Sequence, residues 1–498
     1  MSYLGLDVGT SGVKVTVVAR SGAVVARAYR EYNLRFPRPG WIEIRPDDVR
    51  AAVFEVIRAA AHHTVEEIEA IATASFGEAV ALIGKGGEAV CDSIFYTDAR
   101  GTEELAYIRA RVDPAALEMR TGMPINAMYT LPKLLWLKRI RPDVLDQTRM
   151  ILPYGSFVEY LLTGEAATDS SLASRTLLFN RETRSWDAEL CAAFGIEPGM
   201  LPVHIPAGTP IARIMPKLAE EFGLSKNTIV VSGVHDQIAA ALGAGTLSAG
   251  DVADGIGSSE CLIAPLPASP NLRGMFAHNI CAEPHAVPGE SVALAFTSTA
   301  GAALKWFRDQ FEPELAAKCK TQGISAYDVL NSCLSEAPTS LLFLPHLAGS
   351  GTPHMDACAT GMISGLTLSS TKADLYRAIY EGLNFEILMN LEMLQNTGFA
   401  IERITACGGG ASEASLKIKA DILNAPIWML ENAESGTVGL AMLSGVALGH
   451  FASFEQAAEA LVRRVKCIEP RSAYRSEYQE KYEQYSRMFS SCRAIYGR

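Results

Sequence analysis

A polar turn near the start of the chain has residues that could hold phosphate groups. The turn and its flanks supply Asp7, Gly9, Thr10, Ser11 and Lys14 within eight residues. Glycine lets backbone N–H groups approach a phosphate closely, hydroxyls donate hydrogen bonds, and lysine adds a positive charge. Asp7 could orient a magnesium ion through water, because magnesium keeps several waters and takes few protein carboxylates. An ordinary polar hairpin turn is the alternative, and this combination of residue types favours phosphate binding.

A second small-residue turn lies much later in the chain. The run Gly408-Gly409-Gly410-Ala411 follows a predicted strand over Ile404–Cys407 and precedes a predicted helix. Consecutive small residues let a flat ligand or a phosphate lie against the backbone near a helix N-terminus. On spacing alone, a tight strand-to-helix turn explains this run equally well.

A third candidate is Asp236, which lies between a predicted strand and a predicted helix, directly after His235. An aspartate in this position usually caps the N-terminus of the helix. Asp236 also precedes a stretch of small residues over 243–250, where a hinge between two domains would place a cleft. The residue types alone leave two interpretations open, a helix cap and a catalytic carboxylate.

The elements that would position these residues alternate between strands and helices. In the N-terminal half we expect strands over Tyr3–Val8, Val13–Ala19, Ala23–Ala28, Ala70–Ser75 and Ala79–Ile83, and a helix over Pro46–His62. A similar opening recurs halfway, with strands over Ile229–Gly233, Asp251–Gly255 and Cys261–Ala264, a helix over Gln237–Leu242 and a turn at Gly257-Ser258-Ser259. The C-terminal part is predicted to be mainly helical, over Ala373–Leu394, Glu413–Leu423, Gly436–Phe451, Phe454–Val465 and from about Ser476 onward. This mixture predicts an α/β fold.

Length and composition predict a folded protein of two domains. The 498 residues exceed what one hydrophobic core usually supports. The proportions of hydrophobic residues (49%) and charged residues (20%) are ordinary for a folded soluble protein. We expect the boundary in the small-residue stretch between Gly243 and Asp251, which gives domains over 1–246 and 247–498.

Charge, apolar patterning and cysteine usage indicate which partners and which location to expect. The formal net charge of −11 argues against a nucleic-acid partner, because phosphate backbones demand a basic surface. No secretory signal and no long apolar window of about 18 residues is visible, so we expect no membrane partner. The ten cysteines are scattered without a CxxC pair, which indicates reduced thiols and a cytoplasmic location.

Two longer patterns are more specific than these short turns. One runs over Met128–Arg139 and the other over Gly361–Glu381. In this order they resemble the two signatures of the FGGY carbohydrate kinases, which include xylulose, ribulose, gluconate and glycerol kinases. The first pattern departs at its last position, where Ile140 replaces a polar residue. The resemblance runs from Tyr3 to about Phe451, and the xylulose kinase branch is the most similar.

The resemblance implies a fold, a reaction and a set of site residues. The implied fold is a two-domain, actin-like duplication of ribonuclease H-like domains with a cleft between them. The implied reaction is ATP-dependent phosphorylation of a hydroxyl on a small sugar or polyol, with Mg2+ at the phosphates. By position, Asp236 matches the catalytic base, and Glu78 and Gln237 match substrate contacts. The predicted nucleotide contacts are Asp7, Gly9, Thr10, Ser11, Lys14, Gly257, Ser258, Gly301, Gly409, Gly410 and Ala411.

The segment Ser75–Glu78 leaves the sugar open. It sits where xylulose kinases carry Gln-Met-His and where glycerol kinases carry Gln-Arg-Glu. Glu78 keeps the carboxylate of the glycerol kinases, whereas Gly77 lacks their arginine. Met128 stands where glycerol kinases place a substrate-contacting tyrosine. These departures argue against glycerol and also weaken the match to plain xylulose kinases, so the substrate stays open among ketoses such as xylulose or ribulose, and polyols.

Two other classes of function are alternatives to a kinase. An ATP-driven machine of the actin or chaperone type would share the phosphate turns but need no sugar pocket. A sugar-binding regulator would have an inactive kinase site. Retention of Asp7, Thr10, Lys14 and Asp236 favours an active kinase over this regulator. The sequence does not specify the oligomeric state, and a homodimer is one option.

Overall fold

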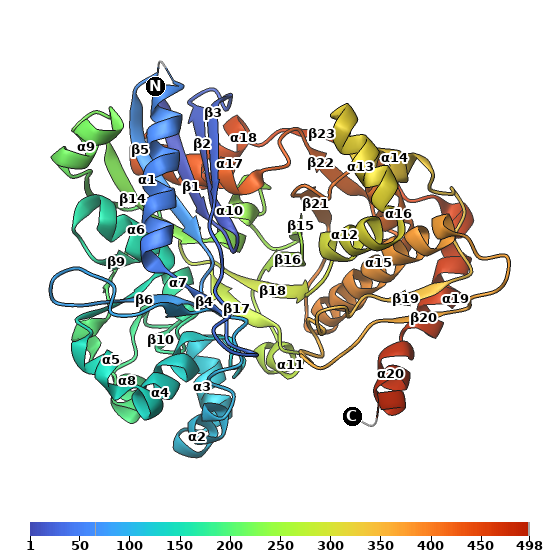
Figure 1. Ribbon diagram of the computed structural model, residues 1–498, viewed down its shortest axis with the longest axis horizontal. Helices are drawn as coiled ribbons and strands as arrows, with labels where there is room; N and C mark the ends of the chain where they lie inside the picture. The colour runs from blue at the N-terminus through green and yellow to red at the C-terminus, as the bar shows by residue number, and fades with distance from the viewer. Residues whose placement is uncertain (65, 497–498) are drawn as a thin grey trace. The chain divides into compact units, whose positions relative to one another are not determined.

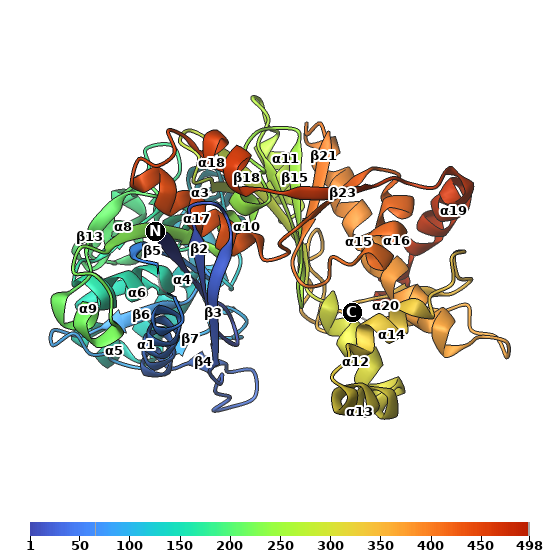
Figure 2. The ribbon, with the colours of Figure 1, turned by 90° about the horizontal axis from the view of Figure 1, so that it is seen from above.

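The computed structural model describes residues 1–64 and 66–496 and is drawn in Figures 1 and 2. Its contacts divide the chain into two units. Unit 1 consists of Met1–Leu247, Cys281–Val292 and Glu434–Val462. Unit 2 consists of Ser248–Ile280, Ala293–Ala433 and Arg463–Arg498.

Unit 1 is built on a six-stranded sheet in the order β13-β14-β5-β1-β2-β3. The strands are β1 (Ser2–Val8), β2 (Gly12–Ala19), β3 (Val24–Glu31), β5 (Ile68–Ser75), β13 (Pro210–Arg213) and β14 (Ile229–His235). The central β1 pairs antiparallel with β2 and parallel with β5, and β14 pairs parallel with β5. The parallel pairs need crossover connections, and helices between the paired strands supply them.

Helices cover both faces of this sheet (Figure 2). Side chains of β1 alternate between the two faces. Leu4 and Leu6 belong to the core cluster that includes Val53 of α1 (Pro46–His62). On the opposite face, a Cβ on Gly5 would lie 3.1 Å from Cβ of Leu440, in α17 (Ser435–Ala447). Burial on both faces explains why β1 reads as a nearly continuous apolar run.

The late segment 434–462 belongs to unit 1 because its helix α17 packs closely on α10 (Asp236–Gly243). A Cβ on Gly243 would clash with the carbonyl of Ser435, and a Cβ on Gly439 would clash with the carbonyl of Ala239. Glycines at the crossing therefore let the two backbones touch. The division by residue number at 246/247 assigned this segment to the second domain, so the units are interleaved in sequence.

Unit 2 repeats the arrangement around β1. Its strands follow the order β18-β16-β15-β21-β22-β23. They are β15 (Asp251–Ile256), β16 (Glu260–Pro265), β18 (Ser291–Thr297), β21 (Arg403–Cys407), β22 (Ile427–Leu430) and β23 (Arg464–Ile468). The central β15 pairs antiparallel with β16 and parallel with β21, just as β1 does with β2 and β5. The predicted actin-like duplication of an α/β domain is therefore confirmed.

The predicted elements of the C-terminal part differ from the structure at three places. The predicted helix over Phe454–Val465 ends at Leu461 as α18, and β23 follows because it pairs with β22. The predicted helix over Gly436–Phe451 ends at Ala447. The terminal helix is two helices, α19 (Arg475–Tyr485) and α20 (Met488–Tyr496). Among the described residues, none of the helices combines the length and apolar character needed to span a bilayer.

Candidate functional site

The first phosphate turn connects β1 to β2 in unit 1. Because β1 ends at Val8 and β2 begins at Gly12, the connection is formed by Gly9, Thr10 and Ser11. The N–H of Gly9 donates to the carbonyl of Gly12 at 3.0 Å, which closes the turn. Thr10 and Ser11 are exposed, so their hydroxyl groups can reach a ligand.

Asp7 and Lys14 are partners across the β1–β2 pairing. Burial raises the pKa of Asp7 to about 6, the charge of Asp236 raises it as well, and Lys14 opposes this rise. Lys14 Nζ lies 3.2 Å from Oε1 of Glu434. The structure thus brings Asp7 near Asp236, although most of unit 1 separates them in sequence.

A divalent cation fits the carboxylate of Asp7. Carboxylate oxygens suit Mg2+, and a cation would offset the burial and repulsion that favour protonation of Asp7. Across residues 1–64 and 66–496, no group of three or more His, Cys, Asp or Glu side chains is arranged to hold a metal. This finding is compatible with an ion that takes one protein carboxylate and keeps its other positions for water and phosphate oxygens.

Asp236 is the first residue of α10 and follows directly on the end of β14. The N-cap position of α10 is His235, which makes no side-chain capping bond. The interpretation of Asp236 as a helix cap is therefore wrong. The Asp236 carboxylate retains 30% of its side-chain exposure, so it is accessible to a ligand.

The backbone before Asp236 is fixed by buried polar groups. The N–H of Gly233 donates to Oε1 of Glu159 at 2.7 Å, and the N–H of His235 donates to Oγ of Ser171 at 2.8 Å. A Cβ on Gly233 would clash with the carbonyl of Thr73, so only glycine lets β14 approach β5 here. Such constraints hold the position of the following carboxylate.

A chain of charged side chains leads to Asp236 within unit 1. Arg175 forms an ion pair with Glu78, and its second terminal nitrogen lies 3.0 Å from Oε2 of Glu283. His235 Nδ1 lies 2.9 Å from Oε1 of Glu283, and His235 Nε2 lies 3.2 Å from Oδ1 of Asp236. The four members other than Asp236 are buried. We call these five residues the Asp236 cluster.

The cluster and its neighbours shift the pKa of Asp236 in opposite directions. Burial raises the pKa of Asp236, the neighbouring His235 lowers it, Glu78 raises it, and a hydrogen bond with Gln237 lowers it. The pKa of Tyr96 is raised by burial and then by the charges of Glu78 and Asp236. Glu78, Gln237 and Tyr96 therefore all lie close to the predicted base.

Four residues of this site were not predicted from the sequence: Tyr96, Arg175, His235 and Glu283. One signal for two of them was present. Arg175 and Glu283 interrupt segments that are otherwise apolar or hydroxyl-bearing, and charged residues in such segments are seldom buried without a partner. The sequence does not say which partners they choose, because these contacts join distant parts of the chain.

The glycine turns of unit 2 lie against one another. The N–H of Gly301 donates to the carbonyl of Gly257 at 2.9 Å, and the N–H of Ala300 donates to the carbonyl of Ser258 at 2.8 Å. The N–H of Gly410 donates to the carbonyl of Ile256, one residue before Gly257, at 3.1 Å. Four predicted nucleotide contacts from three segments of the chain therefore meet at the end of β15.

Close approach explains the glycines at these turns. A Cβ on Gly301 would lie 2.7 Å from the carbonyl oxygen of Gly257. Gly408 has a φ of +86°, which side-chain-bearing residues rarely adopt, and a Cβ there would lie 2.5 Å from the carbonyl oxygen of Ile256. A Cβ on Gly409 would meet nothing within 4 Å. Gly409 thus faces space that a ligand can use.

A buried ion cluster lies beside these turns. Lys419 of α16 (Glu413–Leu423) pairs with Asp254 of β15 and with Glu260 of β16. All three side chains are at most 3% exposed. The cluster therefore fastens the β15–β16 hairpin, which carries Gly257 and Ser258, to the helix that follows the Gly408–Ala411 turn.

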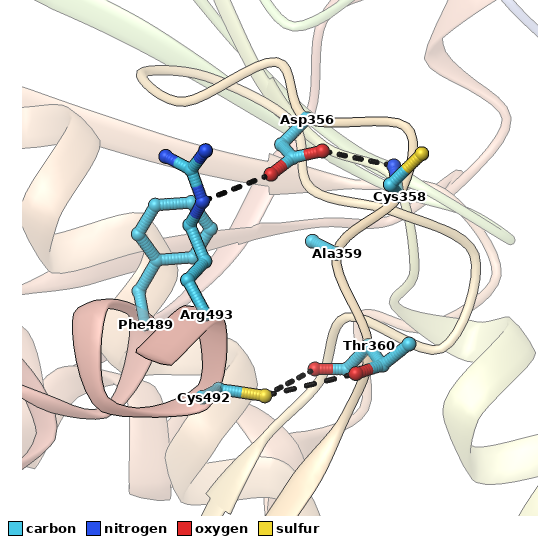
Figure 3. Close-up of a pocket in the computed structure, with 7 residues that line it drawn as sticks. All are labelled: Asp356, Cys358, Ala359, Thr360, Phe489, Cys492 and Arg493. Atoms are coloured by element: carbon cyan, nitrogen blue, oxygen red, sulfur yellow. Dashed lines mark hydrogen bonds and ion pairs between the residues drawn. The ribbon is translucent and has the colours of Figure 1, made fainter. Parts of the chain in front are cut away.

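A small pocket in unit 2 lies outside these groups. Figure 3 shows it between the loop over 356–360 and α20. Arg493 Nε lies 3.5 Å from Oδ2 of Asp356, and the Sγ of Cys492 lies 3.4 Å from the carbonyl oxygen of Thr360. These contacts fasten α20 to the loop. The pocket contains none of the predicted site residues.

Comparison with known proteins agrees with this arrangement. The sequence pattern of the "FGGY family of carbohydrate kinases, N-terminal domain" matches residues 2–243, and that of its C-terminal domain matches residues 255–448. A xylulose kinase from Bacillus subtilis (strain 168) is 26% identical over 495 residues, which cover 98% of this chain and 97% of that protein.

Two solved structures have the same fold over the whole chain. A xyloylose kinase from Brucella ovis is 30% identical with a TM-score of 0.87, covering 99% of this chain and 100% of that one. A gluconate kinase from Lactobacillus acidophilus is 25% identical with a TM-score of 0.88, covering 100% of this chain and 99% of that one. The chain therefore belongs to the FGGY family of carbohydrate kinases, whose members phosphorylate sugars with ATP.

Proposed function

We propose that this kinase phosphorylates a hydroxyl of a neutral ketose or polyol, with xylulose as the first candidate and Asp236 as the general base. The observation that carries the proposal is the partly exposed Asp236 carboxylate at the end of the otherwise buried Asp236 cluster. Relatives named xylulose kinase support the choice of a pentulose. Unit 1 would bind the sugar and unit 2 the adenosine part of ATP.

The charge of the Asp236 cluster favours a neutral sugar over a sugar acid. Three carboxylates, those of Glu78, Glu283 and Asp236, face one guanidinium and one imidazole. Arg175 is engaged by Glu78 and Glu283 and so does not offer its charge to a substrate carboxylate. A gluconate carboxylate would add a fourth negative charge, which costs free energy in a buried site.

Different residues have different roles in phosphoryl transfer. The sugar hydroxyl oxygen forms a bond to the γ-phosphorus, the bond from that phosphorus to the β–γ bridging oxygen breaks, and ADP leaves. Asp236 accepts the hydroxyl proton, which moves late in a loose transition state. Lys14 and the Gly9–Ser11 turn hold phosphate oxygens through charge and hydrogen bonds. A bound Mg2+ would neutralise phosphate charge, and Asp7 would hold it through water.

The proposed function is tested by ADP release in the presence of different sugars. The panel contains pentuloses, hexuloses, pentitols, tetritols and gluconate, each at saturating ATP. We expect a pentulose to give the highest kcat/KM and gluconate to give little turnover. ADP release that does not depend on any added sugar would instead indicate an ATP-driven machine. Preference for gluconate would contradict the charge argument.

Glu78 is expected to select the sugar. Its carboxylate can accept hydrogen bonds from sugar hydroxyls, and a site built for a hydroxyl discriminates against analogues that lack it. Glu78→Ala should raise the sugar KM by about tenfold or more, which corresponds to about 1.4 kcal/mol. Glu78→Gln should lose less, because it keeps one acceptor. Sugar and ATP KM values measured for both variants check this, and an unchanged sugar KM would make Glu78 a structural partner of Arg175 only.

Lys14 is expected to act on phosphate rather than on sugar. Lys14→Ala should raise the KM for ATP by about tenfold, because a charge-assisted contact to phosphate is lost. The sugar KM should stay close to that of the wild type. Arg27→Ala is the matched control, since Arg27 also pairs with Glu434, at 3.6 Å, but lies outside the turn. A defect in sugar KM with normal ATP kinetics would contradict the assignment.

A further inference from the structure

His235 lies between two carboxylates, one on each side of its ring. Nδ1 lies 2.9 Å from Oε1 of Glu283, and Nε2 lies 3.2 Å from Oδ1 of Asp236. The imidazole is 5% exposed and the Glu283 side chain is fully buried, whereas Asp236 is 30% exposed. The arrangement therefore runs from the protein interior to the most exposed carboxylate of the Asp236 cluster.

This arrangement restricts how the Asp236 carboxylate can turn. Because Nε2 of His235 lies beside Oδ1 as an ion-pair contact, Oδ2 is left as the oxygen that can accept a proton from a substrate. Glu283 lies against the other ring nitrogen as an ion-pair contact at 2.9 Å, which limits how far the buried ring can turn. The 2.9 Å contact to Glu283 lies in the usual range of charge-assisted pairs, and the 3.2 Å contact to Asp236 is longer.

We propose that His235, backed by Glu283, is a positioning residue that holds Oδ1 of Asp236 and thereby directs Oδ2 to the sugar hydroxyl. This inference rests on the proposed role of Asp236 as the general base. His235 does not touch the substrate. Its contribution is to orient the base before reaction, which lowers the barrier only in the step where the proton moves.

Local structure supports a dedicated role for this pair. Burying a charged pair costs desolvation energy, and well-packed apolar residues often serve stability as well or better. A Cβ on Gly77 would lie 2.7 Å from Cγ of Arg175 and 3.2 Å from Cδ2 of His235. Glycine at this position therefore leaves room for the Arg175 and His235 side chains beside Glu78. The fold thus accommodates buried charges at a site where apolar side chains would give equal or greater folding stability.

Three substitutions at His235 separate positioning from packing. The amide nitrogen of Gln occupies about the place of imidazole Nε2, and that of Asn occupies about the place of Nδ1. His235→Gln can thus keep the contact to Asp236, whereas His235→Asn can keep only the contact to Glu283. Each is measured for kcat, for the KM of ATP and of the best sugar, and for thermal unfolding.

We expect His235→Ala and His235→Asn to lower kcat by about 10- to 100-fold, as loss of a polar contact to a charged group predicts. His235→Gln should keep kcat within about threefold of wild type, and the KM for ATP should change little in all three. Glu283→Gln should lower kcat by about three- to tenfold. His204→Gln is the control, because His204 is a half-buried histidine of unit 1 that bonds to Ser170.

The outcomes distinguish this inference from the proposed function. Equal kcat values for the Gln and Asn variants would overturn the inference, and that comparison stands even if the Ala variant does not fold. A fall in kcat that merely follows thermal stability would overturn it too. If Asp236→Asn keeps its turnover, the proposed base is wrong. If Asp236→Asn is inactive while His235→Ala turns over normally, only the positioning role fails.

Discussion

Asp236→Asn is expected to lower kcat by about 10²–10⁴-fold, which is the usual contribution of a general base. Asparagine has the shape of aspartate but cannot accept the proton of the sugar hydroxyl. The backbone at this position is held by the contacts of Gly233 and His235, so the variant should fold normally. ATP binding should be unchanged, because Asp236 does not contact the nucleotide in the proposed mechanism.

The measurement is kcat with the best sugar of the panel, together with ATP affinity and thermal unfolding of the same preparation. Asp113→Asn is a matched control. Asp113 caps α3 (Pro114–Thr121) in unit 1, and asparagine caps helices about equally well. The control should behave as wild type. Turnover by Asp236→Asn within about tenfold of wild type would remove Asp236 from the mechanism.

Local elements could be predicted from the sequence because their signals are local. The β1–β2 hairpin has valine-rich strands on either side of a polar glycine turn. Helix α1 begins at Pro46 with acidic residues in its first turn, and the predicted bounds match the observed ones. Helix α16 starts after Ser412, whose side chain makes a capping box with Ser415. In each case propensity and packing favour the same structure.

The interleaving of the two units could not be predicted from composition. Segment 434–462 returns to unit 1 because glycines in α10 and α17 allow a close helix crossing. Glycine inside a helix usually lowers the stability of that helix, so the sequence alone does not show that these glycines allow two helices to pack closely. β23 was likewise missed, because its pairing with β22 is a long-range contact that overrides a helix-like pattern.

The candidate site shows the same division between local and distant signals. The turns at Gly9–Ser11 and Gly408–Ala411 were found because glycine and hydroxyl residues stand next to one another. Arg175 and Glu283, which connect Glu78 to His235, were not found, because they come from separate segments of the chain. A single sequence does not show which residues form such pairs, because the pairs depend on tertiary structure.

Lys419→Met is expected to destabilise the protein by about 3–5 kcal/mol, the usual cost of removing one partner from a buried ion pair. Methionine fills much of the space of the lysine stem but leaves Asp254 and Glu260 buried without their cation. Burial already raises the pKa of Glu260 to about 8, while Lys419 holds it down and Asp254 raises it. Without the lysine, protonation of Glu260 would be favoured more strongly.

Urea unfolding of Lys419→Met at two pH values tests this electrostatic origin. Protonation neutralises Glu260, whose pKa of about 8 would rise further without Lys419, so the defect should be smaller at pH 6 than at pH 9. The triple variant Lys419→Met/Asp254→Asn/Glu260→Gln should recover part of the loss at both values. Lys417→Met is the matched control, since Lys417 lies on the same helix and is 53% exposed. A defect that is independent of pH and of the triple substitution would point to packing.

The same variant tests whether the buried cluster supports nucleotide binding. Lys419 connects the hairpin that carries Gly257 and Ser258 to the helix after the Gly408–Ala411 turn. Loss of its ion pairs should therefore weaken the contact between these two turns of unit 2. The KM for ATP should therefore rise, whereas the KM for the sugar should change little because the sugar residues lie in unit 1. Equal changes in both KM values would mean that the cluster supports overall folding and has no particular effect on the nucleotide turns.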